Sequence, residues 1–244
     1  MKKISLIIPA HNEQEYIENT VLSFNHELKK ENIPHDILVI NDNSCDETED
    51  VLKRIAVNIP ELRYINNCFP SGFGLAVRRG LDEFRGDYVS VVMADLSDRP
   101  EDLVAYYRKL EEGYDAVFGS RFSMGGKSLG YPKTKYALNR FTNNLIRLFF
   151  GIRYDDVTNA FKAYSREAVD GLRPFLSSHF NLTVELPLKI IVRGYSYAVV
   201  PNQWVNRRKG KSKLKIKEMG SRYFFIILYC LLEKWLSRGD YKKR

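Results

Sequence analysis

Three side chains that carry oxygen follow an apolar run near the middle of the chain. Asp95, Ser97 and Asp98 come directly after Val89–Met93, which has the composition of a buried strand. One or two carboxylates with such neighbours suit Mg²⁺ or Mn²⁺, because these cations take most of their remaining ligands from substrate phosphates. Since Pro100 follows at once, we expect Asp98 also to cap a helix, with Asp95 as the principal metal ligand.

Polar residues also follow the first two apolar runs. His11 and Glu13 follow the first run, and Asn41 and Asp42 follow the second. In open parallel sheets, ligands bind just beyond the carboxyl ends of the strands. We therefore expect these residues to meet at one edge of a sheet and to form a binding site there.

Two glycine motifs could bind phosphate. Gly72 and Gly74 precede a helical pattern, where glycines would let a pyrophosphate approach backbone amides; an ordinary turn is the alternative. Gly210-Lys211-Ser212 resembles the end of a nucleotide-binding P-loop, but Val205 stands where the first glycine belongs. We therefore reject a P-loop.

The elements that must position these residues alternate along the first half of the chain. Short β-rich runs are separated by segments with apolar residues at helical spacing, which predicts an α/β fold with a mostly parallel sheet covered by helices on both faces. The predicted strands are 4–8, 37–40, 62–65, 88–93, 116–118 and 197–200, and the predicted helices are 16–28, 49–55, 75–84, 133–150 and 184–192.

Charge is distributed unevenly over the 244 residues. The net charge is +8, but residues 201–244 carry +10 and the rest of the chain carries −2. A basic end attracts phosphate groups of nucleic acid, lipid headgroups or a substrate. No recognised nucleic-acid module is present, so nucleic acid is not an expected partner. The three cysteines are far apart and form no CxxC pair, which suits a reducing compartment.

The basic end contains the apolar stretch 223–232. It covers about half of the roughly 20 residues needed to span a bilayer. One interpretation is a helix buried against the body or against a second copy of the chain. We favour a helix in the membrane interface, with Trp235 at headgroup level.

A set of motifs in fixed order resembles family 2 glycosyltransferases of the GT-A (Rossmann-like) fold, and more narrowly the polyprenyl-phosphate branch that is similar to dolichol-phosphate mannose synthase. The resemblance covers roughly residues 4–214 and is specific as a set. Its motifs are Ile7-Ile8-Pro9-Ala10-His11-Asn12-Glu13, Val39-Ile40-Asn41-Asp42-Asn43-Ser44, Met93-Ala94-Asp95-Leu96-Ser97, Gly119-Ser120-Arg121-Phe122, Asp156-Val157-Thr158-Asn159-Ala160-Phe161, Glu185-Leu186-Pro187, and Arg207 to Leu214.

The resemblance implies a role for each matching residue. Asp95 would hold the metal that bridges the diphosphate of a nucleotide sugar. The nucleotide pocket would be lined by Pro9, His11, Glu13, Asn41 and Asp42, and the acceptor phosphate and the leaving diphosphate would be bound by Arg121, Arg207 and Lys213, with Lys135 and Asn139 as weaker candidates.

Two positions depart from the family pattern. Asn41 replaces the first aspartate of the usual pair before the base pocket, and Met93 replaces the first aspartate of the usual Asp-x-Asp metal motif. The first change bears on base recognition and the second on metal binding, which then rests on Asp95 with help from Ser97, Asp98 or Asp42.

We therefore expect an inverting transferase that moves a hexose from a nucleotide sugar (GDP-mannose or UDP-glucose type) to a polyprenyl or dolichyl phosphate. A phosphate acceptor is already an anion, so it needs cationic clamps rather than a general base. We expect residues 1–205 to form the transferase domain, with a nucleotide-sugar half (1–118) and an acceptor half (119–205). Residues 206–244 would form a basic acceptor loop and an interfacial helix on a peripheral, cytoplasmic protein that could form homo-oligomers.

Two alternatives stay open. Transfer to a saccharide or another hydroxyl acceptor would require a general base, for which Asp156 and Glu185 are the candidates. The other alternative is a non-catalytic basic adaptor for membranes or nucleic acid, which the carboxylate missing at Met93 makes conceivable.

Overall fold

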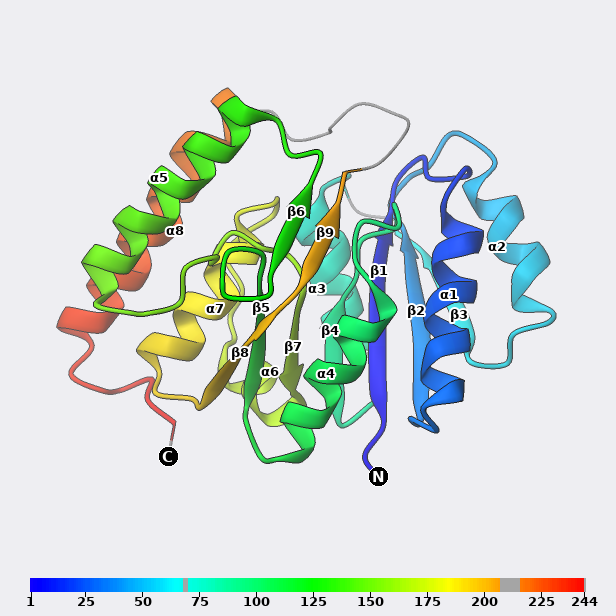
Figure 1. The fold of residues 1–244 in the computed structure, drawn as a ribbon, viewed down its shortest axis with the longest axis horizontal. Coiled ribbons are helices and arrows are strands. Elements are labelled where there is room, and N and C mark those ends of the chain that lie inside the picture. The colour runs from blue at the N-terminus through cyan, green and yellow to red at the C-terminus, as the bar shows by residue number, and fades with distance from the viewer. Residues whose placement is uncertain (68–69, 207–215, 244) are drawn as a thin grey trace.

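The computed structural model of the protein describes residues 1–67, 70–206 and 216–243. Its centre is a seven-stranded sheet in the order β3-β2-β1-β4-β7-β5-β8 (Figure 1). Neighbouring strands are parallel except at β7, which runs antiparallel to β4 and β5. A small second sheet pairs β6 with β9. The strands are β1 (Ile4–Ala10), β2 (His35–Asn41), β3 (Leu62–Asn66), β4 (Tyr88–Val91), β5 (Ala116–Ser120), β6 (Lys127–Leu129), β7 (Lys162–Ser165), β8 (Tyr197–Pro201) and β9 (Gln203–Val205).

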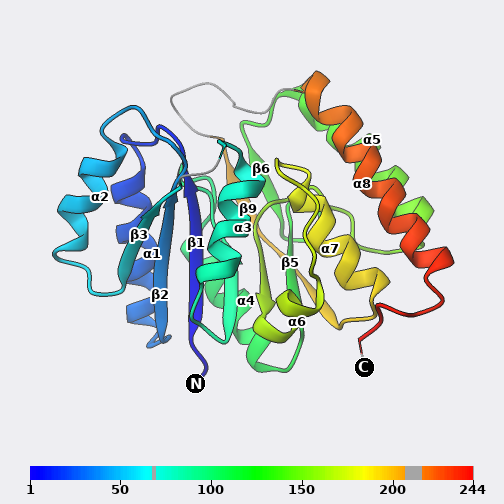
Figure 2. The ribbon, with the colours of Figure 1, turned by 180° about the vertical axis from the view of Figure 1, so that it is seen from behind.

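Helices cover both faces of the sheet. α1, α2 and α4 pack on one face, while α3, α6 and α7 pack on the other, as Figures 1 and 2 show from opposite sides. Alternate residues of the central strands enter the two buried clusters, so that Ile7 faces one and Ile8 the other. The helices are α1 (Ile17–Lys30), α2 (Thr48–Ala56), α3 (Phe73–Glu83), α4 (Pro100–Glu111), α5 (Lys133–Phe150), α6 (Arg166–Gly171), α7 (Leu182–Val192) and α8 (Ile216–Leu236).

The structure confirms the predicted α/β fold class, and the composition of the strands explains why it could be predicted. A parallel strand buried on both faces is apolar at nearly every position; β1 has that composition, and so does the middle of β2, Ile37–Ile40. α5 has the predicted bounds, and it ends at Gly151, whose φ of 64° is the left-handed conformation that glycine favours at a helix end. β6, β7, β9 and α6 were not predicted.

α8 belongs to the same packed body as the sheet. It lies beside α5 in both views and packs against α7 (Figures 1 and 2). Ile226, Cys230 and Leu231 of α8 are buried. Arg193, at the end of α7, donates two hydrogen bonds to the Glu233 carboxylate of α8, at 2.7 and 3.0 Å. In the part of the chain that the structure describes, no helix has the length and apolar character needed to cross a membrane.

Candidate active site

The carboxyl ends of β1 and β2 bring the predicted donor-side residues together. His11 follows β1, and its Nδ1 lies 2.7 Å from the carbonyl oxygen of Asp42. Because a carbonyl can only accept, Nδ1 carries the proton. Pro9 lies in β1 opposite Ile40 of β2, and Glu13 precedes α1, where its N–H donates to Thr48 Oγ1 at 2.9 Å. The predicted meeting of these residues at one sheet edge is thus what the structure shows.

The carboxylate of Asp42 is hydrogen-bonded within the protein. Its carboxylate accepts hydrogen bonds from Asn67 Nδ2 at 2.8 Å, from the Gly72 N–H at 2.8 Å and from Ser71 Oγ at 3.0 Å. The side chain is 4% exposed. It therefore fastens the start of α3 to the end of β2, and its two oxygens are engaged before any ligand arrives.

Asn41 presents an acceptor whose orientation is fixed by a chain of hydrogen bonds. Its Nδ2 donates to Asn66 Oδ1 at 2.8 Å, and Asn66 Nδ2 donates to Glu49 Oε1 at 3.0 Å. Hydrogen bonds from Asn66 and Lys53 lower the pKa of Glu49, so this carboxylate is ionised and can only accept. Asn41 Oδ1 is thereby left buried, with no hydrogen-bond donor among the described residues. Such an oxygen suits an N–H group of a ligand.

Gly72 and Gly74 allow a close approach of protein rather than of pyrophosphate. A Cβ atom on Gly74 would lie 2.6 Å from the backbone of Ser178 and His179, and one on Gly72 would lie 2.7 Å from the Ser178 carbonyl oxygen. The Leu75 N–H donates to that same oxygen at 3.2 Å. The 178–179 segment therefore covers the start of α3, which is the physical reason for glycine at both positions.

The turn after β4 holds the two predicted carboxylates. Asp95 Oδ1 accepts from the Ser97 N–H at 3.2 Å, and Leu96 between them has a φ of 58°. Asp98 is buried and accepts from the Met93 N–H at 3.0 Å. Burial, reinforced by the nearby charge of Asp95, raises the pKa of Asp98 to about 7.

The prediction that Asp98 caps α4 is wrong. Arg99 occupies the N-cap position, and no side chain caps this helix end. The Asp98 carboxylate instead closes the turn that begins at Met93.

This turn fits a divalent cation that takes further ligands from a substrate. The described residues contain no group of three or more His, Cys, Asp and Glu side chains placed to hold a metal ion. Asp95, Ser97 and Asp98 nevertheless lie in one turn, and the two carboxylates repel each other. A cation held there by Asp95, Ser97 and Asp98 would relieve that repulsion.

Arg121 is held in a buried ion pair. Its backbone N–H, Nε and Nη2 donate to the Asp156 carboxylate at 2.9, 2.8 and 2.7 Å. The side chains of Arg121 and Asp156 are 7% and 0% exposed. The predicted phosphate clamp therefore has two of its three guanidinium nitrogens committed to Asp156, which sets its position at the end of β5.

Glu185, the other candidate base, is also committed. It is fully buried on α7, where its carboxylate accepts from the N–H groups of Leu176 and Ser177 at 2.8 and 2.7 Å. Lys189 Nζ lies 2.6 Å from Glu185 Oε1. This carboxylate holds the segment before α7 in place.

The remaining acceptor-side candidates are dispersed. Asn139 donates to Thr158 Oγ1 at 2.7 Å and accepts from Asn143 Nδ2 at 2.8 Å, so its amide ties α5 to the segment before β7. Lys135 is partly exposed on the first turn of α5. Arg207 and Lys213 lie outside the described residues.

The sequence did not single out an aromatic cluster beside Arg121. Phe122 packs edge-on against Tyr136, with ring centres 5.6 Å apart, and Tyr131 lies 6.2 Å from Tyr136 and 5.2 Å from Trp204. The pairing of β6 with β9 brings Trp204 to Tyr131 from a distant part of the chain. In the sequence, the one local sign of this cluster is that Phe122 directly follows Arg121.

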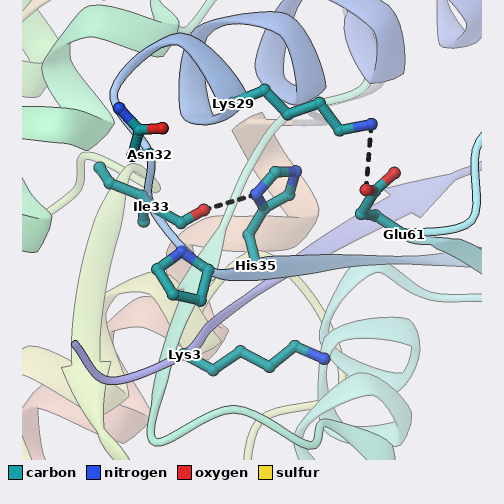
Figure 3. Close-up of a pocket in the computed structure, with 7 residues that line it drawn as sticks. Lys3, Lys29, Asn32, Ile33, His35 and Glu61 are labelled. Atoms are coloured by element: carbon teal, nitrogen blue, oxygen red, sulfur yellow. Dashed lines mark hydrogen bonds and ion pairs between the residues drawn. The ribbon is translucent and has the colours of Figure 1, made fainter.

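A cavity of about 520 Å³ lies away from this site (Figure 3). It is lined by residues at the amino ends of β1 and β2, among them Lys3 and His35. Its cations are paired, Lys29 with Glu61 at 3.0 Å and Lys3 with Asp36 at 3.4 Å. The cavity is therefore on the opposite edge of the sheet and contributes nothing to the site.

The chain is similar to curated glycosyltransferases. It is 30% identical to the glycosyltransferase AglD of Haloferax volcanii, over 88% of this chain but 34% of that protein. It is 29% identical to the polyprenol monophosphomannose synthase of Mycolicibacterium smegmatis, over 86% of this chain and 80% of that one. It is 30% identical to the dolichol-phosphate mannosyltransferase of Pyrococcus furiosus, over 88% of this chain and 60% of that protein.

Solved structures share the fold. Glucosyl-3-phosphoglycerate synthase of Mycobacterium tuberculosis, crystallised with Mn²⁺, UDP-glucose and phosphoglyceric acid, has a TM-score of 0.68 and 20% identity, over 96% of this chain and 79% of that one. The same enzyme with Mg²⁺ and UDP gives the same score. The sequence model of glycosyl transferase family 2 matches residues 5–173, more than half of the chain. With the strand-end motifs and this fold, the match shows that the chain belongs to glycosyl transferase family 2.

Proposed function

We propose that the protein transfers a hexose, with inversion, from a nucleotide sugar to a polyprenyl or dolichyl phosphate at the cytoplasmic face of a membrane. Two relatives support this acceptor by name, the polyprenol monophosphomannose synthase and the dolichol-phosphate mannosyltransferase. A GDP-mannose or UDP-glucose type of donor is consistent with these names and with the fold neighbour crystallised with UDP-glucose.

The observation that carries the proposal is the state of the two candidate bases. A hydroxyl acceptor needs a base that can take its proton. Asp156 is fully buried and bound by three N–H groups of Arg121, and Glu185 is fully buried and bound by Lys189 and two backbone N–H groups. A phosphate acceptor needs no base because it is already an anion, so the committed state of both acids favours it.

The proposed donor pocket lies at the ends of β1, β2 and β4. Asn41 Oδ1 would accept an N–H of the nucleobase, with His11 and Glu13 beside it. Asp95, with Ser97 and Asp98, would hold Mg²⁺ or Mn²⁺. When bound, this cation would supply positive charge that stabilises the departing diphosphate.

The proposed membrane contact is the outer surface of α5 and α8. Large apolar side chains are exposed on both helices, and an apolar surface of this extent marks a protein or membrane contact. Because the acceptor is a lipid, we assign the surface to a bilayer, with Trp235 at headgroup level. The exposed side chains are Leu138, Phe141, Leu145, Leu148 and Phe149 of α5, and Phe224, Phe225, Leu228, Leu232, Trp235 and Leu236 of α8.

The test is a transfer assay with a matched set of acceptors. Radiolabelled GDP-mannose, UDP-glucose and related donors are incubated with Mn²⁺ and with polyprenyl phosphate, polyprenol or free saccharides. We expect label only in polyprenyl phosphate, with an anomeric configuration opposite to that of the donor. Label in polyprenol or in a saccharide would favour a hydroxyl acceptor, and no transfer with any pair would favour the non-catalytic adaptor.

A further inference from the structure

Two guanidinium groups lie close to the ring of Phe122. Arg121 Cζ is 5.4 Å from the ring centre, and Arg140 Cζ, from the second turn of α5, is 4.4 Å from it. Tyr136 closes the edge of the same ring at 5.6 Å. Two cations from separate elements therefore share one aromatic side chain at the end of β5.

The two arginines differ in how many of their N–H donors are already bonded within the protein. Arg121 is 7% exposed, and its Nε and Nη2 are bound to Asp156. The Arg140 side chain is 25% exposed, and its Nη1 donates to the Asp155 carbonyl oxygen at 3.1 Å. Within the described chain that is its one hydrogen bond, and the nearest Asp155 carboxylate oxygen is 4.0 Å away. Arg140 thus keeps most of its N–H donors for a ligand.

The neighbours of Arg140 along α5 suggest what that ligand is. Phe141 follows directly and is 61% exposed, and Leu148 further along is 75% exposed. A guanidinium presents paired N–H groups that match phosphate oxygens. A cation beside an exposed apolar helix surface fits a molecule that carries a phosphate head on an apolar chain.

We propose that Arg140 binds the phosphate of the lipid acceptor, and that Arg121 is a positioning residue that acts through Phe122. Phe122 and the Asp155 carbonyl hold the Arg140 guanidinium in place, so little of its freedom is lost when a phosphate binds. Arg121, held by its ion pair with Asp156, also lies against the Phe122 ring. This assignment rests on the proposed function, because it needs a polyprenyl phosphate as the acceptor.

The test compares Arg140→Gln with Arg54→Gln. Arg54 is an exposed residue of α2 that pairs with Glu18, so its loss changes the net charge equally at a distant place. The rate of transfer is measured in mixed micelles, first with polyprenyl phosphate varied and then with the nucleotide sugar varied. For Arg140→Gln we expect the KM for polyprenyl phosphate to rise about tenfold or more, as for the loss of a charge-assisted hydrogen bond. The KM for the nucleotide sugar should stay within about twofold of the wild type, by the same argument.

Arg140→Lys separates charge from geometry. It keeps the positive charge but loses the paired N–H groups, so its KM for the lipid should fall between those of the wild type and Arg140→Gln. If Arg140→Gln behaves as Arg54→Gln does, the assignment is wrong. It is also wrong if Arg140→Gln raises both KM values together with a loss of thermal stability, because that result indicates a structural role.

Two further arms identify the source of the phosphate and separate this inference from the proposed function. Vesicles of phosphatidylglycerol without polyprenyl phosphate should bind Arg140→Gln as well as they bind Arg54→Gln, and a selective loss there would assign Arg140 to bilayer headgroups instead. If the wild type transfers sugar to polyprenyl phosphate while Arg140→Gln is unaffected, only the assignment of Arg140 fails. If the wild type uses no polyprenyl phosphate, the proposed function fails and this inference fails with it.

Discussion

Replacing Asp156 with Asn should destabilise the protein strongly. The substitution keeps the shape of the side chain but removes the charge that compensates the buried Arg121 guanidinium. Breaking one side of such a pair costs about 3–5 kcal/mol, because it leaves an uncompensated charge in the interior. At about 2–4 °C per kcal/mol for a chain of this size, the melting temperature should fall by roughly 6–20 °C.

The measurement is chemical and thermal unfolding of three variants. Asp50→Asn is the matched control, because Asp50 is 77% exposed and its pairing with Lys53 should contribute less than about 1 kcal/mol. The double variant Arg121→Met with Asp156→Leu replaces the pair by apolar groups and should recover most of the loss. A loss below about 1 kcal/mol for Asp156→Asn would refute this account of the pair.

Turnover of the same variant bears on the alternative acceptor. If Asp156→Asn stays as stable as the wild type and yet loses several orders of magnitude in rate, Asp156 acts as a general base and the acceptor is a hydroxyl group. If the loss of rate follows the loss of stability, Asp156 acts through Arg121.

Three more expectations follow from contacts described above. Gly74→Ala should lower the free energy of unfolding, measured in denaturant, by about 1–3 kcal/mol, because its Cβ would lie 2.6 Å from the backbone of the 178–179 segment. Gly220→Ala, which has open space around it in α8, should raise the free energy of unfolding by up to about 1 kcal/mol. Equal effects of the two substitutions would contradict the packing argument. Asp95→Asn should abolish the Mn²⁺-dependent rise in melting temperature that a nucleoside diphosphate gives the wild type, and an unchanged rise would remove Asp95 from the metal site. Burial lowers the pKa of His35 below 6.5. On acidification the unfolded state therefore takes up a proton first, and the stability of the fold decreases as the pH drops below about 6.5. His35→Gln should make the free energy of unfolding depend less steeply on pH in this range, and an unchanged slope would contradict the argument.

The sequence predicted the parts of this fold that repeat a strong local pattern. β1 and the middle of β2 are largely apolar runs, and α5 has a helical period over its whole length, so these elements were predicted. β6 and β9 have three residues each and β7 has four, which is too short for a period to emerge. Their existence depends on partners elsewhere in the chain.

Positions of candidate site residues at strand ends could be predicted from the sequence, whereas contacts between distant parts of the chain could not. The apolar runs before His11, Asn41 and Asp95 predicted that these residues stand at strand ends, which is where the structure places them. The ion pair of Arg121 with Asp156 joins residues 35 positions apart, and nothing local marks either as the partner of the other. The close approach of the backbone at Gly72 and Gly74 could not be predicted, because the covering segment lies about 100 residues later.

The reversed direction of β7 determines which residues next to it lie at the edge of the sheet that carries the candidate site. A strand parallel to β1 places at this edge the residues that follow it in the chain. β7 runs the other way and places there the residues that precede it, so that Lys162, its first residue, pairs with Val91, the last residue of β4. Asp155 and Asp156, which precede β7 in the chain, therefore lie at the edge that carries the candidate site. Among homologous enzymes, changes in the length of the segment between α5 and β7 should therefore alter acceptor use, while equivalent changes after β7 should be neutral to it.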